Sequence, residues 1–136
     1  MTLCDAGPLV ALIDADDPYH ALCVTASASL QPEPMITTWP CLTEAMYFLY
    51  RADGITAQNE LWSYLSDGVL QVYLPYVHEW HRLEELMNKY ADMPLDMADA
   101  SLISAAERLN DRRLFSMDQH LRAVRIHGSQ FFDVVP

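Results

Sequence analysis

The chain has 136 residues, of which 51% are hydrophobic and 20% are charged. This length is typical of one domain, and the hydrophobic fraction excludes a disordered or low-complexity chain. The formal net charge of −11, from 8 Lys and Arg against 19 Asp and Glu, excludes binding to nucleic acid through a general basic surface. We therefore expect a single domain over residues 1–136.

Short apolar runs alternate along the chain with longer segments of helical period. The first half predicts, in chain order, a strand over 1–4, a turn at 5–8 leading into the apolar run 9–13, a helix over 18–30, a strand over 35–38, a helix from 40 to Gly54 and a helix over 55–66. The second half predicts a strand over 69–73, a helix from Pro75 to about Tyr90, a helix from Asp96 to about Asn110, a strand over 114–116 and a last strand over 131–135. This alternation favours an α/β fold with helices on both faces of a mostly parallel sheet.

Acidic residues stand where the predicted strands end and where helices begin. In open parallel sheets the functional crevice lies outside the carboxyl ends of the strands, so these positions are the candidates for a site. Five acids with small or apolar neighbours occupy them: Asp5, Glu44, Asp96, Asp99 and Asp118. Such neighbours favour side chains that point inward.

Each of these acids also has a structural interpretation. Asp96, followed by Asp99, is typical of a helix cap, which we favour for Asp96 taken alone. Asp118 fits a cap for a helix from Gln119 equally well. Asp5 can bond the backbone of its turn, and Glu44 can be an ordinary first-turn acid.

The combination of acids carries more information than any one of them. Carboxylates that converge on one crevice raise each other's pKa unless a cation neutralises them. Carboxylate ligands without His or Cys are typical of Mg²⁺ or Mn²⁺, which keep several waters and bind phosphate oxygens. The sequence therefore predicts metal-dependent phosphoryl chemistry, in which the metal acidifies a bound water for attack.

Other sites are less well supported. His78 and His81 are three residues apart, whereas a zinc protease helix requires HExxH. A receiver domain requires a Lys after a late strand, but the only Lys is Lys89 in a predicted helix. An aspartyl phosphatase requires DxD after the first strand, where Gly7 stands.

Arginines and aromatic residues offer candidate RNA contacts. Residues 101–136 contain five Arg against four acids, whereas residues 1–50 contain six acids and no Lys or Arg. We expect contacts to the RNA backbone from this end of the chain, at Arg112, Arg113, Arg122 and Arg125, and an ordinary solvated face is the alternative for these arginines. Several aromatic residues can stack on bases, but their spacing favours the core: Trp39, Trp62, Tyr64, Tyr73, Tyr76 and Trp80.

The motifs around the acids resemble the PIN domain family and, within it, the VapC type of bacterial toxin ribonucleases. The resemblance covers essentially the whole chain. Its segments are Leu3 to Asp14 with Asp5, Asp16 to His20, Thr37 to Ala45 with Glu44, Met93 to Leu102 with Asp99 and its companion Asp96, and Leu114 to Asp118 with Ser116 two residues before the last acid.

This resemblance implies a three-layer α/β/α domain that binds Mg²⁺ or Mn²⁺ and cuts RNA as an endonuclease. It implies catalytic roles for Asp5, Glu44, Asp99 and Asp118, and metal ligation by Asp5, Asp99 and Asp118 with Asp96 as an auxiliary ligand. Ser116 joins the three predicted substrate contacts Arg112, Arg113 and Arg122. The implied partners are a cognate antitoxin that holds the enzyme inactive and a second copy of the chain in a homodimer.

Two departures from the family pattern leave alternatives open. Ala6 stands where many members carry Ser or Thr, which puts one hydroxyl contact to the site in question. The stretch 119–122 lacks the acid and aromatic residue that often follow the fourth motif. A PIN-fold binding protein with weak or no catalysis, and a nuclease for DNA or for a particular nucleic-acid structure, are the alternative functions.

The sequence also predicts a location. The three cysteines have no CxxC spacing and are typical of buried thiols in a reducing compartment. Asp5 and Asp14 bracket the first apolar stretch, which has no basic region before it, so a signal peptide fits poorly. No apolar run approaches the roughly 20 residues of a membrane span. We therefore expect a cytoplasmic protein with no membrane partner.

Overall fold

The computed structural model describes residues 1–136 and contains a five-stranded sheet and five α-helices. The strands are β1 (Thr2–Cys4), β2 (Met35–Thr37), β3 (Leu70–Val72), β4 (Arg113–Phe115) and β5 (Asp133–Val135). The helices are α1 (Ala6–Ile13), α2 (His20–Leu30), α3 (Trp39–Ser66), α4 (Trp80–Lys89) and α5 (Met97–Leu109), with a short 3₁₀ helix η1 (Gln119–Arg122). No helix is both long and apolar enough to cross a membrane.

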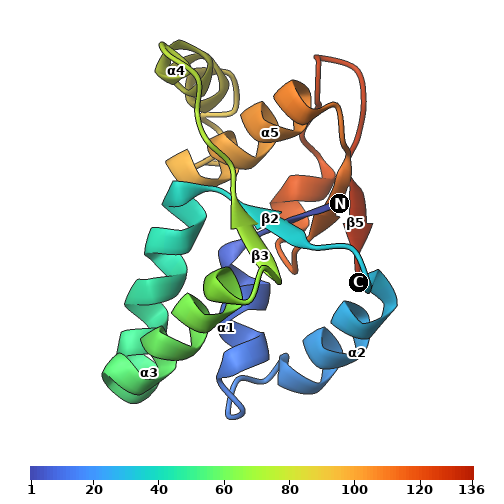
Figure 1. Ribbon diagram of the computed structural model, residues 1–136. Coiled ribbons are helices and arrows are strands. Elements are labelled where there is room, and N and C mark those ends of the chain that lie inside the picture. Colours follow the sequence, from blue (N-terminus) through green and yellow to red (C-terminus); the bar gives the residue numbers. More distant parts are fainter.

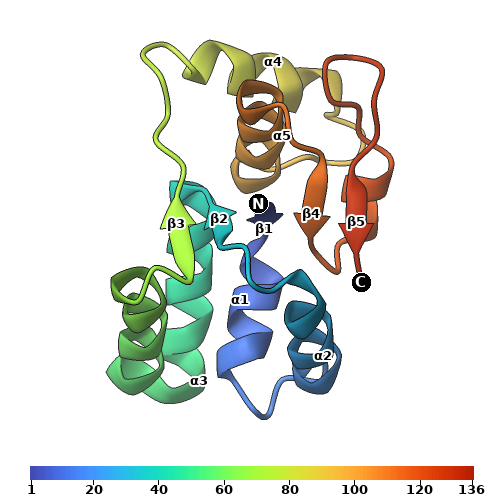
Figure 2. The same ribbon diagram turned by 45° about the vertical axis from the view of Figure 1, so that its right-hand side comes forward.

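The sheet has the strand order β3-β2-β1-β4-β5, and every neighbouring pair is parallel. β1 lies at the centre, where Leu3 pairs with Ile36 of β2 and with Leu114 of β4. In Figures 1 and 2, α1, α2 and α3 lie below the strands, and α4 and α5 lie above them. The predicted three-layer α/β/α fold is confirmed, and all five strands end at the same edge.

The core is built around the central strands and α5. Leu3, Leu114 and Phe115 are at most 1% exposed, and every residue of α5 from Ala98 to Ala106 is buried. Small side chains let α5 pack closely against both α3 and α4. The acid in the first turn of α5, Asp99, is thereby fixed by the core and not by a loop.

Residues 5–13 differ from the prediction of a turn followed by an unassigned apolar run. They form α1, because the Asp5 carboxylate accepts a hydrogen bond from the Ala6 N–H at 2.7 Å and caps the helix. Pro8 lies in the first turn, where its missing N–H leaves no helical bond unmade. The Gly7-Pro8 pair is therefore compatible with a helix start.

Two other boundaries also differ. The predicted break at Gly54 is a kink inside α3, where Gly54 adopts φ 58° and ψ −146°, a conformation that glycine reaches without a Cβ clash. α4 begins at Trp80 and not directly after Pro75, because a turn with a left-handed residue, His78 at φ 68°, precedes it. The remaining helices and strands lie where the sequence predicts them, within a few residues.

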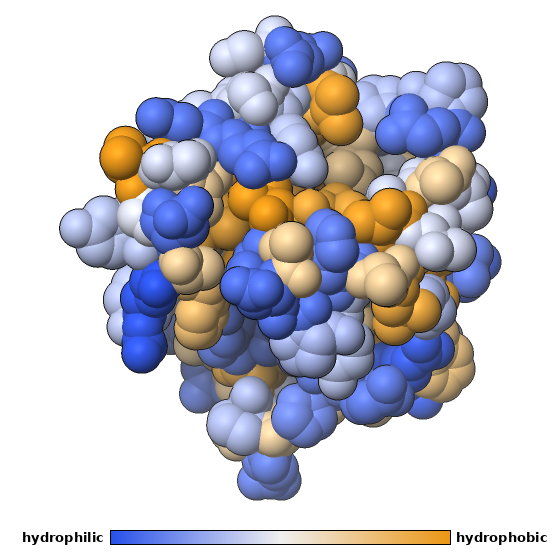
Figure 3. Space-filling model, turned by 90° about the horizontal axis from the view of Figure 1, so that it is seen from below, coloured by the Kyte–Doolittle hydropathy of each residue, from blue (hydrophilic) through white to orange (hydrophobic).

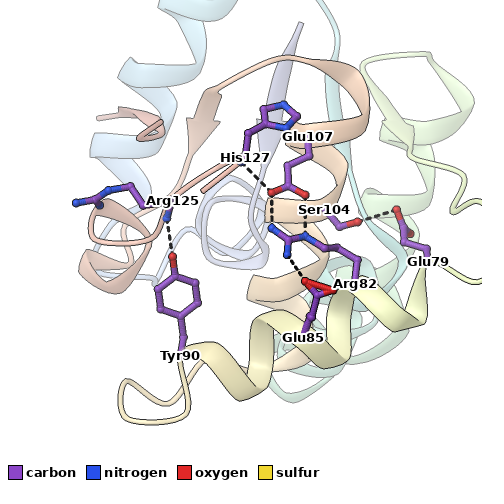
Figure 4. Close-up of polar contacts among 8 residues, drawn as sticks. All are labelled: Glu79, Arg82, Glu85, Tyr90, Ser104, Glu107, Arg125 and His127. Atoms are coloured by element: carbon purple, nitrogen blue, oxygen red, sulfur yellow. Dashed lines mark hydrogen bonds and ion pairs between the residues drawn. The ribbon is translucent and has the colours of Figure 1, made fainter. Parts of the chain in front are cut away.

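A half-buried ion pair holds α4 against α5 (Figure 4). Nε and Nη2 of Arg82 donate to the two Glu107 oxygens at 2.9 and 2.7 Å. One of these oxygens also accepts the His127 N–H at 2.9 Å, and the Tyr90 hydroxyl accepts the Arg125 N–H at 2.9 Å. The pair therefore joins α4, α5 and the segment before β5 in one network.

Glu107→Gln tests the contribution of this network to stability. Burial alone raises the pKa of Glu107, but Arg82 and the His127 N–H outweigh burial and lower it. We expect the substitution to reduce the free energy of unfolding by about 1–3 kcal/mol at pH 7. A carboxyl group whose pKa is lowered on folding stabilises the protein at pH values above its unfolded pKa of about 4.3. The difference in stability between wild type and variant should therefore shrink as the pH falls through the folded pKa. Urea unfolding between pH 7 and pH 3 measures it.

The control for this experiment is Glu84→Gln on α4, because Glu84 is exposed and forms no ion pair. It should change stability by less than about 0.5 kcal/mol. A loss for Glu107→Gln that stays constant at all these pH values contradicts an electrostatic origin.

Candidate active site

Asp5 lies at the centre of the candidate site. It follows β1, is 9% exposed, and accepts the Ser116 hydroxyl on Oδ2 at 2.7 Å in addition to the Ala6 N–H on Oδ1. Burial raises the pKa of Asp5, the two hydrogen bonds lower it, and repulsion from Asp118 and Asp96 raises it further. The net shift is upward, so the carboxylate is held in place but lacks a countercharge.

Ser116 links Asp5 to Asp118. Its hydroxyl donates to Asp5 and accepts the Asp118 N–H at 3.0 Å, and the side chain is 1% exposed. This contact supplies a hydroxyl to the first acid, which Ala6 cannot provide. The expected departure at Ala6 therefore leaves Asp5 with a hydroxyl partner.

Asp96 and Asp99 form a capping box at the start of α5. Asp96 Oδ1 accepts the Asp99 N–H at 2.8 Å, and Asp99 Oδ2 accepts the Asp96 N–H at 3.3 Å. The predicted cap is confirmed. Burial, followed by repulsion from Asp96, raises the pKa of Asp99 to about 8. The Asp99 carboxylate thus takes part in a helix cap and has a strongly raised pKa.

Glu44 and Asp118 complete the set. Glu44 lies half-buried near the start of α3, and burial followed by repulsion from Asp96, Asp5 and Asp118 raises its pKa. Asp118 follows β4 and caps η1, because its Oδ1 accepts the His120 N–H at 2.9 Å. The structure therefore places the five predicted acids near the carboxyl edge of the sheet, where Asp5, Glu44 and Asp99 are each repelled by at least two of the others.

No Lys, Arg or His of the chain forms an ion pair with the buried and half-buried acids of this set, Asp5, Glu44 and Asp99. The ion pairs of the molecule involve Glu33, Glu85, Glu107 and, through His120 at 3.4 Å, Asp118. Asp5, Glu44 and Asp99 have none, so no cation offsets the burial and the repulsion that raise their pKa values.

These residues fit a hard divalent ion. All the donors are carboxylate oxygens, which Mg²⁺ and Mn²⁺ prefer, and the site has uncompensated negative charge. No three His, Cys, Asp or Glu side chains lie close enough together to form a ready-made metal centre. The carboxylates would therefore share the coordination of such an ion with water and phosphate oxygens, as is usual for Mg²⁺.

The predicted RNA-contacting arginines are divided between the two ends of the strands. Arg122 lies in η1 beside Asp118, and its Nη2 donates to the Pro136 carbonyl at 2.9 Å, just past the carboxyl end of β5. Arg112 and Arg113 lie at the opposite end, before and at the first residue of β4. The structure does not bring these two arginines to the carboxylates.

Aromatic side chains are more exposed than their spacing predicts. The assignment to the core is wrong for Trp39, Trp62, Tyr76 and Trp80, which are 40–57% exposed, and holds for Tyr73 at 7%. Tyr64 is partly buried against the core. The aromatic surface on α3 therefore includes Trp39, next to the acids.

Sequence reasoning missed the polar side chains that surround the acids. The Cys41 thiol lies 3.9 Å from Asp5 Oδ1, and the Thr38 and Ser101 hydroxyls lie 2.6 Å apart and join the starts of α3 and α5. Glu79 is buried in a cavity that also contacts Glu44 and Asp96. Their contacts span 36 to 63 residues or involve distant elements, so no local motif reveals them.

Comparisons with known proteins identify the family and the fold. Residues 2–126 match the family model described as "PIN domain". Ribonuclease VapC26 of Mycobacterium tuberculosis (strain ATCC 25618 / H37Rv) is 26% identical over 136 aligned residues, which cover 97% of this chain and 98% of that protein. The crystal structure of Mycobacterium tuberculosis VapC20, described as a Sarcin-Ricin loop cleaving toxin, has a TM-score of 0.83 at 18% identity and covers 100% of both chains.

Asp99→Asn tests the repulsion between the acids. Because the pKa of Asp99 is about 8, the folded protein keeps a proton that the unfolded chain releases, so metal-free wild type should lose stability as the pH rises from about 4 to 8. Asparagine preserves the cap acceptor without the charge. After allowance for solvent screening, we expect the variant to be more stable by on the order of 1 kcal/mol at pH 8.

Thermal unfolding in EDTA at pH 5 and pH 8 measures this difference. Asp92→Asn is the matched control, because Asp92 is exposed in the turn before α5. An Asp99→Asn variant less stable than wild type at pH 8 contradicts the repulsion.

Proposed function

The chain belongs to the PIN domain family, and on that premise we propose that it is a metal-dependent endoribonuclease, the toxin of a type II toxin–antitoxin pair. The observation that carries the proposal is the meeting of four acids from separate motifs, Asp5, Glu44, Asp99 and Asp118, at one edge of the sheet. RNA is the proposed substrate because the relative VapC26 is named a ribonuclease and VapC20 is described as a toxin that cleaves the Sarcin-Ricin loop.

The chain's own residues have distinct roles in this proposal. Asp5, Asp99 and Asp118 would hold Mg²⁺ or Mn²⁺, with Asp96 as auxiliary ligand, and the bound ion supplies an acidified water and charge stabilisation on the phosphate. Glu44, whose pKa is raised, is suited to accept a proton at the edge of the site. Ser116 keeps Asp5 and Asp118 at a fixed separation.

The cognate antitoxin is the proposed regulator. Beside the carboxylates lies a cavity of about 910 Å³ with a largely apolar lining. A peptide of the antitoxin that covers this crevice would exclude RNA and can place a cation among the uncompensated acids. The three free, buried cysteines suit the reducing cytoplasm, where we place the pair.

A homodimer is the proposed assembly. α2 and α3 expose large apolar side chains, among them Leu22, Val24, Tyr50 and Ile55 at 45–62%. Figure 3, which views the molecule from the side of these helices, shows hydrophobic residues in a band bordered by hydrophilic ones. A contiguous exposed apolar surface of this kind favours association.

The chemistry is tested by cleavage of labelled structured and single-stranded RNAs with Mg²⁺, Mn²⁺ or EDTA. We expect cuts that require the metal and that Asp99→Asn slows by at least about 100-fold, because the variant loses a carboxylate that would hold the ion. Asp92→Asn should cut like wild type. An Asp99→Asn variant that cuts normally removes Asp99 from the mechanism, and cleavage of DNA alone favours the DNA nuclease.

Metal binding is tested without any substrate. An ion that binds only the folded state raises the melting temperature, by an amount equivalent to about 2.7 kcal/mol at a hundred times its Kd. We expect Mn²⁺ to raise the melting temperature of wild type by several degrees and to raise that of Asp5→Asn much less. Equal shifts for both proteins contradict ligation by Asp5, and no shift for either favours the binding-protein alternative.

A further inference from the structure

One carboxylate that lines the cavity beside the acids has no role in the proposed reaction. Glu44 and Asp96 line it together with Glu79, which comes from the turn before α4. Because two acids of the site also line the cavity, a substrate held for cutting at the carboxylates has its neighbouring nucleotide at this opening. The side chains that line the cavity can therefore influence which RNA is cut.

Glu79 is a buried carboxylate with one oxygen unused. It is 6% exposed, and Oε1 accepts the Tyr73 hydroxyl at 2.6 Å and the Ser104 hydroxyl at 2.9 Å (Figure 4 shows the latter). Oε2 accepts no hydrogen bond from the chain, and Glu79 belongs to no ion pair. Among the side-chain oxygens and nitrogens without a partner, only Thr2 Oγ1 is fully buried. Glu79 Oε2 also has no partner, so it is not fully buried and can accept a hydrogen bond from a donor that enters the cavity.

Exposed aromatic rings form the opposite wall. Trp39, Tyr47 and Phe48 of α3 line the cavity and are 48%, 58% and 45% exposed. Rings left open to solvent next to a nuclease site are stacking surfaces for unpaired bases, and each stacked base contributes about 1–3 kcal/mol. The cavity thus offers a stacking face and a hydrogen-bond acceptor, the two elements that read an extruded base.

We propose that this cavity receives an unpaired base next to the cut and that Glu79 selects bases with an exocyclic amino group against uracil. The inference rests on the proposed ribonuclease function. Both lone pairs of Oε1 are occupied, so Oε2 is the acceptor that reads the base. Adenine, cytosine and guanine can donate an amino N–H to Oε2, whereas the one donor on the uracil edge, N3–H, lies between two carbonyl oxygens that a carboxylate repels.

The charge of the cavity favours a base over the sugar–phosphate backbone. Glu44, Asp96 and Glu79 add negative charge to this largely apolar lining, so a phosphate is repelled, whereas an uncharged base with an N–H donor is not. A bound base displaces water from Oε2, so a base that offers no suitable donor leaves this oxygen without a partner, which is the usual source of strong discrimination.

Cleavage of short single-stranded RNAs of random sequence, with product ends read by sequencing, tests the selection. With wild type, we expect uracil to be depleted about 10-fold at one position next to the cut. Glu79→Gln keeps the acceptor for Tyr73 and Ser104 but can donate to a carbonyl oxygen, so the depletion should fall below about 2-fold. Glu84→Gln on the exposed side of α4 should match wild type.

Binding provides a readout that needs no cleavage. Fluorescence anisotropy with labelled oligocytidylate and oligouridylate compares Asp99→Asn with the double variant that also carries Glu79→Gln. We expect about 10-fold tighter binding of oligocytidylate, lost in the double variant. Tyr47→Leu should weaken both oligonucleotides alike, because stacking does not distinguish them. Thermal unfolding verifies that each variant is folded.

The outcomes separate the inference from the function on which it rests. Cleavage without a uracil bias overturns the role of Glu79 and leaves the ribonuclease intact. Absence of cleavage by wild type, with a Glu79-dependent preference in binding, overturns the proposed function while the cavity still reads bases. Equal binding of the two oligonucleotides, with Glu79-dependent binding of a basic amphipathic peptide, overturns the proposal and assigns the cavity to a protein partner.

Discussion

Mutual repulsion among carboxylates at one edge of a parallel sheet is the constraint that organises this molecule. Asp5 and Asp118 follow neighbouring strands, and Asp99 and Glu44 reach the same edge from helices. Burial and repulsion raise the pKa of Asp5, Glu44 and Asp99, and no Lys or Arg relieves them. The fold must therefore hold these groups together although their burial and repulsion are destabilising. Other interactions must stabilise the folded state.

Helix capping supplies part of that restraint. Asp5, Asp96 and Asp118 each cap the helix that follows, α1, α5 or η1, so the positive end of a helix dipole lies beside each charge. The structural interpretation of these three acids is thus confirmed, and it is compatible with the proposed binding of an ion. A residue that starts a helix and also binds an ion is fixed by backbone geometry, which leaves it little freedom to move away from its neighbours.

The sequence allowed prediction of the acids because each lies in a short motif at a strand end or near a helix start, where local neighbours carry the signal. α1 was missed because Gly7 and Pro8 are typical of a turn, and only the Asp5 cap shows that they begin a helix. The exposed position of Trp39 depends on which face of α3 meets the core, which helical period does not specify. Glu79 depends on Ser104, 25 residues away, so its role lies beyond any local pattern.

Under the proposed function of a metal-dependent ribonuclease, this acidic chain cannot rely on long-range attraction to RNA. With a net charge of −11, the chain repels the phosphate backbone, and two of its predicted contact arginines lie at the far end of the strands from the acids. Binding must then come from short-range contacts, which are divalent ions between carboxylate and phosphate, stacking on the rings of α3, and hydrogen bonds to base edges. Because such contacts depend on shape and on the base, a chain with this charge gives up general affinity for RNA and gains discrimination among RNAs.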